Sequence, residues 1–202
     1  MARRSFSRAE LETFRDAEVP DLMPGPDDPP LRLLFVGINP GLWTAATQTH
    51  FAHPTNRFYP ALLAGGVLTR AIDPAAGMDD ADRAELRSRG IGITNLARRA
   101  TARADELTTA ELREGGERLR ALVDARAPRV VAVAGLTAYR SAFRSPRAAA
   151  GLQPDGWGRD GGTQVWVVPN PSGLNAHHTV ATLAQAYADA ARAAGIPGVP
   201  GA

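Results

Sequence analysis

The stretch Leu33-Leu34-Phe35-Val36-Gly37-Ile38-Asn39-Pro40-Gly41 indicates the fold of this 202-residue chain. Its first four residues form an apolar run typical of a buried strand, and an Asn-Pro-Gly turn follows directly. The pattern recurs downstream, where the apolar run at 165–168 leads into Pro169-Asn170-Pro171-Ser172-Gly173-Leu174-Asn175. In an open α/β sheet the carboxyl ends of the strands form the ligand crevice, so the two turns predict one composite site.

Strand-like and helix-like segments alternate along the rest of the chain. Strands are expected at residues 31–36, 91–94, 129–134 and 163–168, and helices at residues 7–17, 57–63, 79–87, 108–127, 136–143 and 178–194. This alternation predicts a mainly parallel sheet of four strands with helices on both faces. The segment 145–162, which contains Pro and Gly, is expected to be a loop.

Length and composition favour one main domain. With 202 residues and 44% hydrophobic content, the chain is long enough for one good core and short for two domains. We expect an N-terminal helix and Pro-rich strap over residues 1–30, a single domain over residues 31–194 and a flexible tail over residues 195–202. No long apolar run occurs, so a soluble, cytoplasmic protein without a membrane partner is expected.

Two residue types are missing from the chain. Without Cys there can be no disulfide, no Cys-ligated zinc and no iron–sulfur cluster. All 23 basic residues are Arg, whose planar fork suits phosphate oxygens. The absence of Lys removes the usual nucleophile of Schiff-base chemistry.

Asn39 is the first candidate for chemistry, because it follows the first strand and lies beside the rigid Pro40. Its carboxamide can orient a water or bond an amide-like ligand edge, but it is no strong base. A lone Asn-Pro-Gly turn usually supports only itself, whereas a second Asn-Pro turn at another strand end favours a site. Backbone amides in such turns can form an anion-binding nest. The absence of Walker and Gly-x-Gly-x-x-Gly patterns argues against nucleotide cofactors.

Other candidate residues have alternative interpretations. The four histidines are His50, His53, His177 and His178. No acidic cluster stands near either pair, so no metal site is predicted. Phe51 is either a core residue or a stacking surface for a planar base. Ser172 lacks the Gly-x-Ser-x-Gly context of a hydrolase nucleophile.

Five short motifs occur in a definite order. They are Gly-Ile-Asn-Pro-Gly-Leu at 37–42, His-Phe-Ala-His-Pro-Thr-Asn-Arg-Phe-Tyr at 50–59, Gly-Ile-Thr-Asn-Leu at 92–96, Glu-Leu-Arg-Glu-Gly-Gly at 111–116 and Pro-Asn-Pro-Ser-Gly-Leu at 169–174. In this order and at compatible spacing, they make the chain resemble the mismatch-specific uracil-DNA glycosylase and thymine-DNA glycosylase family of the uracil-DNA glycosylase superfamily. The resemblance runs from about Leu31 to about Ala194.

The resemblance implies a three-layer α/β/α sandwich and an enzyme that flips uracil, or a related base opposite guanine, out of duplex DNA. It implies that Asn39 positions the attacking water at C1′ of the deoxyribose. The residues implied for the base pocket are Ile38, Thr44, Phe51, Asn95 and Asn170. The residues implied to enter the DNA are Ser172, Gly173, Leu174 and Asn175, with Leu174 as an apolar wedge.

The chain departs from the family pattern at three positions. Thr44 stands where the family has a small residue near the 5-position of the base. Asn95 stands where some members carry Lys, and Ala176 stands where a relative has Arg. The departure at Thr44 bears on whether thymine is tolerated, and that at Asn95 leaves the role of this side chain open. The departure at Ala176 bears on a contact to the strand that carries guanine.

The expected reaction needs no cofactor. Cleavage of the N-glycosidic bond of uracil leaves a delocalised anion, which backbone donors at a strand end can stabilise. Without Lys the enzyme should be monofunctional, and a monomer that acts on double-stranded DNA is expected. Two alternatives stay open: a lesion- or mismatch-binding protein with negligible turnover, and a small-ligand hydrolase on the same sheet.

Overall fold

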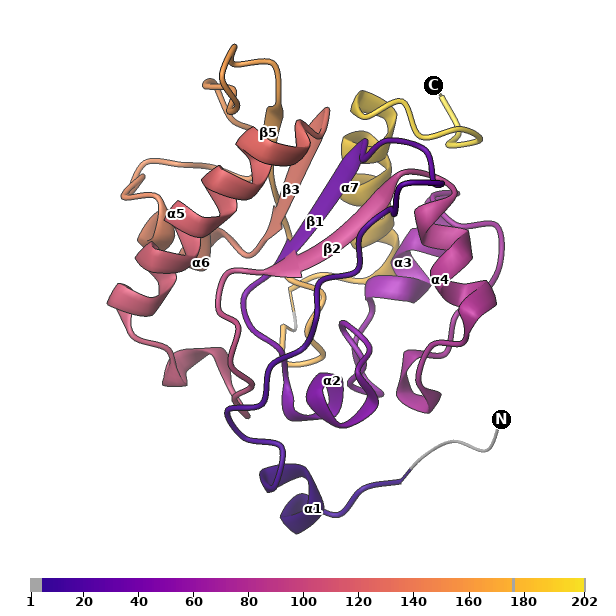
Figure 1. Ribbon diagram of the computed structural model, residues 1–202, viewed down its shortest axis with the longest axis vertical. Helices are drawn as coiled ribbons and strands as arrows, with labels where there is room; N and C mark the ends of the chain where they lie inside the picture. Colours follow the sequence, from indigo (N-terminus) through magenta and orange to yellow (C-terminus); the bar gives the residue numbers. More distant parts are fainter. Residues whose placement is uncertain (1–4, 176, 202) are drawn as a thin grey trace.

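A five-stranded sheet forms the centre of the computed structural model, which describes residues 5–175 and 177–201 (Figure 1). The strands are β1 (Leu33–Gly37), β2 (Ile91–Asn95), β3 (Val130–Ala134), β4 (Gly151–Leu152) and β5 (Gln164–Val168). They lie in the order β2-β1-β3-β5-β4. The pairs β1–β2, β1–β3 and β3–β5 are parallel, and β4 pairs antiparallel with β5.

Helices cover both faces of the sheet. One face carries α3 (Phe58–Ala64), α4 (Asp80–Arg87) and α7 (Val180–Ala193), and the other carries α5 (Thr109–Arg126) and α6 (Leu136–Ala142) (Figure 1). Side chains alternate along β1, so Leu33 and Phe35 enter one core while Leu34 and Val36 enter the other. All four are fully buried. The predicted three-layer α/β/α sandwich is therefore confirmed.

The sheet has five strands rather than the predicted four. The extra strand, β4, lies inside segment 145–162, which the sequence predicts to be a loop. Two residues are too few to show a period of two, and Gly151 has a positive φ of 101°. Three other short elements also lacked a sequence signal: α2 (Leu42–Thr47) and the 3₁₀ turns η1 (Pro74–Ala76) and η2 (Ala104–Glu106).

Two helices, α7 and the first helix of the chain, are shorter than predicted by three residues or more. The side chain of Thr179 accepts a hydrogen bond from the Thr182 N–H, so this cap starts α7 at Val180 rather than at residue 178. The first helix, α1 (Arg8–Glu12), was predicted over residues 7–17. Its backbone leaves the helix earlier and continues as turns.

The N-terminal strap packs against the edge of the sheet. Leu22 bridges Ile93 of β2 in antiparallel fashion, with N···O distances of 3.0 and 2.7 Å. A small core then joins the strap to α2; its buried members are Val19, Leu42, Ala45 and Ala100. The described part of the strap therefore helps to form the end of the molecule where the strands finish.

The C-terminal segment differs from the flexible tail predicted over residues 195–202. Within the described part, which ends at Gly201, Ile196 and Val199 are buried in the core that α3 and α7 form on one sheet face. These apolar side chains gain free energy by leaving water, and this gain opposes fraying. No helix of the described residues is long and apolar enough to cross a membrane.

Candidate active site

A cleft of about 780 Å³ opens beyond the carboxyl ends of β1, β2 and β5. The loops after these strands line it together with α1 and α2, which lie at this end of the sheet (Figure 1). All ten residues predicted for the site line the cleft: Ile38, Asn39, Thr44, Phe51, Asn95, Asn170, Ser172, Gly173, Leu174 and Asn175. The parallel sheet thus brings the two Asn-Pro turns together.

Asn39 has one defined orientation. Its Nδ2 donates to the Pro40 carbonyl oxygen at 3.0 Å and to Thr101 Oγ1 at 2.7 Å. The Thr101 hydroxyl donates in turn to the Arg103 carbonyl oxygen at 2.7 Å, so it can only accept from Asn39. Thr101 is fully buried. With Nδ2 engaged in this way, Oδ1 is the atom of Asn39 that can accept a hydrogen bond from a water or ligand in the cleft.

His50 sets the orientation of Asn95. The Nε2 of His50 lies 3.0 Å from the Pro20 carbonyl oxygen, which can only accept, so Nε2 carries the proton. Burial lowers the pKa of His50 below its ordinary value, so the ring is neutral and Nδ1 is an acceptor. Asn95 Nδ2 donates to this Nδ1 at 3.1 Å. The Asn95 Oδ1 is therefore left as an acceptor.

Phe51 presents an aromatic ring to the cleft. The ring stacks on Phe58 of α3, with centroids 4.1 Å apart and 26° between the planes. Its backbone is in the left-handed region at φ 56°. A Cβ on Gly37 would lie 3.3 Å from Phe51 Cζ and 2.3 Å from Asn95 Oδ1. Because Gly37, at the end of β1, has no side chain, the side chains of Phe51 and Asn95 can pack against it.

Thr44 and Ile38 line the cleft, but some of their polar atoms are already bonded within the protein. Thr44 is buried on α2, and its Oγ1 accepts from the Ala52 N–H at 3.3 Å. The Ile38 carbonyl oxygen accepts from the Ala97 N–H at 2.8 Å. A backbone contact from Ile38 to a base would therefore have to come from its N–H.

The loop between β5 and α7 is held together by its own side chains. Asn170 Oδ1 accepts from the Ser172 N–H at 3.0 Å, and Ser172 Oγ accepts from the Leu174 N–H at 3.3 Å. Asn175 Nδ2 donates to the Asn170 carbonyl oxygen at 3.1 Å, and Asn175 Oδ1 accepts from the His177 N–H at 3.3 Å. Asn175, which was predicted to enter DNA, uses both ends of its amide to shape the loop.

Leu174 projects from this loop. Its exposed fraction is 85%, the highest of the large hydrophobic side chains among the described residues. The neighbouring Gly173 lies against Thr55, where a Cβ would be only 2.1 Å from Thr55 Oγ1. Gly173 is thus required for packing within the protein. The third departure from the family pattern, Ala176, lies outside the described residues.

Comparison with known proteins agrees with this arrangement. The model of the Uracil DNA glycosylase superfamily matches residues 24–191, which include both Asn-Pro turns and all five strands. The chain belongs to the uracil DNA glycosylase superfamily. Membership implies a DNA glycosylase, a hydrolase that acts on DNA, and the α/β sandwich around a mostly parallel sheet agrees with the superfamily fold.

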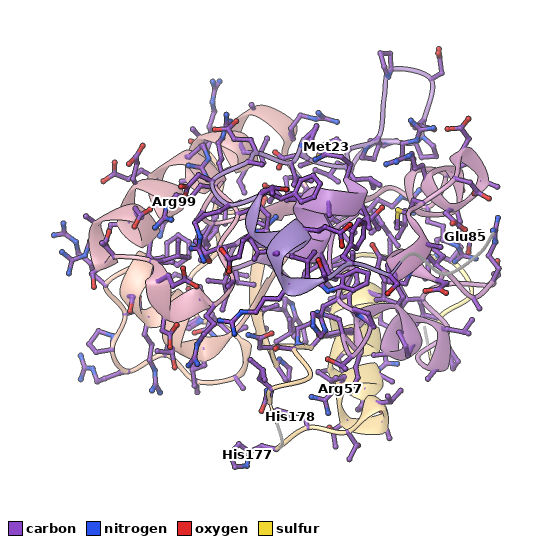
Figure 2. All side chains as sticks on the ribbon, turned by 90° about the horizontal axis from the view of Figure 1, so that it is seen from below. Met23, Arg57, Glu85, Arg99, His177 and His178 are labelled. Carbon is purple, nitrogen blue, oxygen red and sulfur yellow. The ribbon has the colours of Figure 1, made fainter. Side chains whose placement is uncertain are left out.

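The sequence did not indicate two residues that position site side chains in this glycosylase. Thr101, which holds Asn39, stands in a loop without any motif of its own. His50 was considered only as a metal ligand with His53, whereas its contacts orient Asn95. Within the described residues no group of three or more His, Asp or Glu side chains could hold a metal ion. His177 lies at the margin of the molecule, and His178 lies near Arg57 (Figure 2).

Proposed function

We propose that this glycosylase is monofunctional and mismatch-specific, and that it flips uracil, or a related damaged or 5-substituted pyrimidine opposite guanine, out of duplex DNA. The observation that carries the proposal is that the Asn39 amide, the Phe51 ring and the exposed Leu174 share one cleft. A water-orienting group, a stacking surface and an apolar plug are the parts that base flipping and glycosidic hydrolysis need.

Asn95 and Phe51 support a pocket for uracil. Because His50 engages the Asn95 Nδ2, the Oδ1 of Asn95 can accept from a base. Uracil and thymine carry an N3–H that matches this acceptor. Neutral cytosine has an acceptor at N3, so it would leave two acceptors facing each other. The Phe51 ring, supported from behind by Phe58, would stack on the flipped base.

Asn39 would orient the nucleophile. Its Oδ1 accepts a hydrogen bond from a water and directs the water oxygen at C1′. The N1–C1′ bond breaks, its electron pair leaves with the base, and the water oxygen forms the new bond to C1′. The water loses a proton to solvent, and the base anion is protonated on release. Because an amide is a feeble base, stabilisation of the leaving base should govern the rate and turnover should be slow.

Incubation of the full chain with a labelled duplex that contains one G·U pair tests the proposal. We expect release of free uracil and a strand that breaks only after alkali. Borohydride should trap no protein–DNA adduct, because the chain has no Lys. A trapped adduct would contradict the monofunctional reaction. Salt-dependent duplex binding without release would favour a non-catalytic lesion-binding protein, and neither binding nor release would favour a small-ligand hydrolase.

A further inference from the structure

The side chain of Arg57 contacts the loop that carries Leu174. It lies next to His178 (Figure 2). Its Nη2 donates to the Ser172 carbonyl oxygen at 2.7 Å and to the Asn175 carbonyl oxygen at 2.6 Å. Its Nη1 donates to the His178 carbonyl oxygen. One side chain therefore joins the start, the middle and the end of this loop.

Arg57 also ties the loop to the core of the protein. Its backbone N–H donates to the Pro171 carbonyl oxygen at 3.0 Å. It directly precedes α3, in which Phe58 and Leu62 are fully buried. The loop itself contains no strand or helix between β5 and α7 in its described part. Arg57 thus connects this segment, which has no regular structure in its described part, to a rigid helix.

The chemistry of the contact requires the guanidinium group. A planar fork with several N–H donors can reach three carbonyl oxygens at once, whereas the ammonium group of Lys is a compact point charge. No carboxylate among the described residues pairs with Arg57, and its buried Nε–H has no hydrogen-bond partner there. The hydrogen bonds to the three carbonyl oxygens therefore offset the free-energy cost of burying this charge.

We infer that Arg57 is a positioning residue that clamps residues 171–175 and His178 of this loop and so holds Leu174 in place before DNA binds. The inference rests on the proposed function, in which Leu174 fills the space that the flipped base leaves. A loop that is ordered beforehand avoids the entropy cost of ordering it on the duplex. The Arg57 clamp would therefore act on duplex DNA through Leu174 and would not touch the reacting atoms.

Hydrogen exchange of the free protein tests the clamp independently of activity. In Arg57→Met we expect the amides of residues 172–175 to exchange at least about tenfold faster, because local opening becomes easier, while the core strands keep their protection. Arg32→Met is the matched control, because Arg32 donates to the Gly195 carbonyl oxygen at 2.9 Å, far from the cleft. Unchanged exchange at residues 172–175 in Arg57→Met would overturn the inference.

Further variants test whether the clamp depends on the shape of the guanidinium group rather than on its charge, and whether it acts through Leu174. Arg57→Lys, which also serves if Arg57→Met does not fold, should exchange as fast as Arg57→Met, and exchange as slow as the native chain would overturn the clamp. On a G·U duplex, the losses in Arg57→Met and Leu174→Ala should be less than additive when combined. Additive losses would mean that Arg57 does not act through Leu174. Absence of uracil release by the native chain would refute the proposed function, while hydrogen exchange would still decide the clamp.

Discussion

The two hydrogen-bond partners of the Asn39 side chain can accept a hydrogen bond from it but cannot donate one to it. The Pro40 carbonyl has no proton to donate, and the Thr101 hydroxyl has committed its proton to the Arg103 carbonyl oxygen. Rotation of the amide by 180° would place two acceptors against Oδ1. The group that would hold the water is therefore oriented before a substrate arrives, which is the condition for effective electrostatic catalysis.

Asn39→Ala should lower the single-turnover rate of excision from a G·U duplex by about 10²–10³-fold, the usual effect of removing one oriented group from a site of this kind. Duplex affinity should change little, because the amide is needed mainly in the transition state. Rapid-quench excision and a separate binding titration measure the two quantities. Excision close to the native rate would show that Asn39 does not hold the water.

Thr44→Ser should raise the excision of thymine relative to uracil. The change removes one methyl group but keeps a hydroxyl for the Ala52 N–H, which Thr44→Ala would leave unpaired. A methyl-sized obstruction is worth about 1–3 kcal/mol of discrimination, so thymine release should rise about tenfold or more while uracil release changes less. Thr47→Ser on the same helix is the control. Equal changes for the two bases would place Thr44 away from the base 5-position.

Among the elements, α5 shows how a motif can serve packing rather than chemistry. A Cβ on Gly115 would lie 2.1 Å from the Leu96 carbonyl oxygen, and one on Gly116 would lie 2.9 Å from the Ala142 carbonyl oxygen. Gly115 therefore lets α5 approach the chain just after β2, and Gly116 lets α5 approach the end of α6. The approach at Gly115 supports Asn95, which ends β2 at the cleft.

The loop that carries Leu174 combines an ordered backbone with an exposed apolar side chain. Leu174→Ala should weaken excision from a paired duplex by about 1–3 kcal/mol, on the scale of the cost of unstacking a base. The effect on a single strand should be much smaller, because nothing has to be displaced there. Leu152→Ala is the control, since Leu152 is also exposed, at 54%, but lies on β4 outside the cleft. Equal losses on both substrates would make Leu174 structural.

At the scale of the whole molecule, the site depends on a segment outside the strands and helices. The strap supplies the Pro20 carbonyl to His50, and His50 then orients Asn95 at the end of β2. The strap also pairs with β2 through Leu22. A change in the N-terminal segment can therefore alter the orientation of Asn95 in the cleft without touching the cleft itself.

This arrangement predicts how stability depends on pH. The neutral His50 is buried and faces Asp21 and Arg83, and burial lowers its pKa in the folded state. The unfolded chain binds a proton at His50 near its ordinary pKa of about 6.5, so the folded protein should lose stability as the pH falls through that value. The loss should level off below the folded pKa. Thermal unfolding between pH 7.5 and 5.5 measures it.

His50→Gln should flatten this dependence. His53, whose pKa burial also lowers, remains in both proteins, so the difference between the two pH profiles isolates His50. Each protein is compared with its own melting temperature at pH 7.5. Parallel profiles would show that His50 accepts a proton in the folded state as readily as in the unfolded chain.

Local patterns in the sequence were sufficient for the architecture and for the meeting of the two Asn-Pro turns, whereas Thr44 and Asn95 were expected at the cleft only because of the family resemblance. Four of the five strands and the main helices follow from apolar periodicity and breakers. The meeting of two strand-end turns follows from the rule for parallel sheets. The absence of Lys, and with it the expected monofunctional reaction, needs no structure at all. The fifth strand, the packing of the C-terminal segment and α2 could not be predicted from the sequence. Elements this short, and a few isolated apolar residues, show no hydrophobic periodicity.

Only the tertiary structure decided how the site residues are oriented. Thr101 holds Asn39 from 62 residues away, Pro20 holds His50 from 30, and Arg57 reaches His178 across 121. A hydrogen bond depends on the direction of single donor and acceptor atoms, and sequence patterns record only which residues are apolar, polar or turn-forming. The sequence therefore determined which groups gather at the strand ends. The packing of distant segments determined which atom of each group faces the cleft.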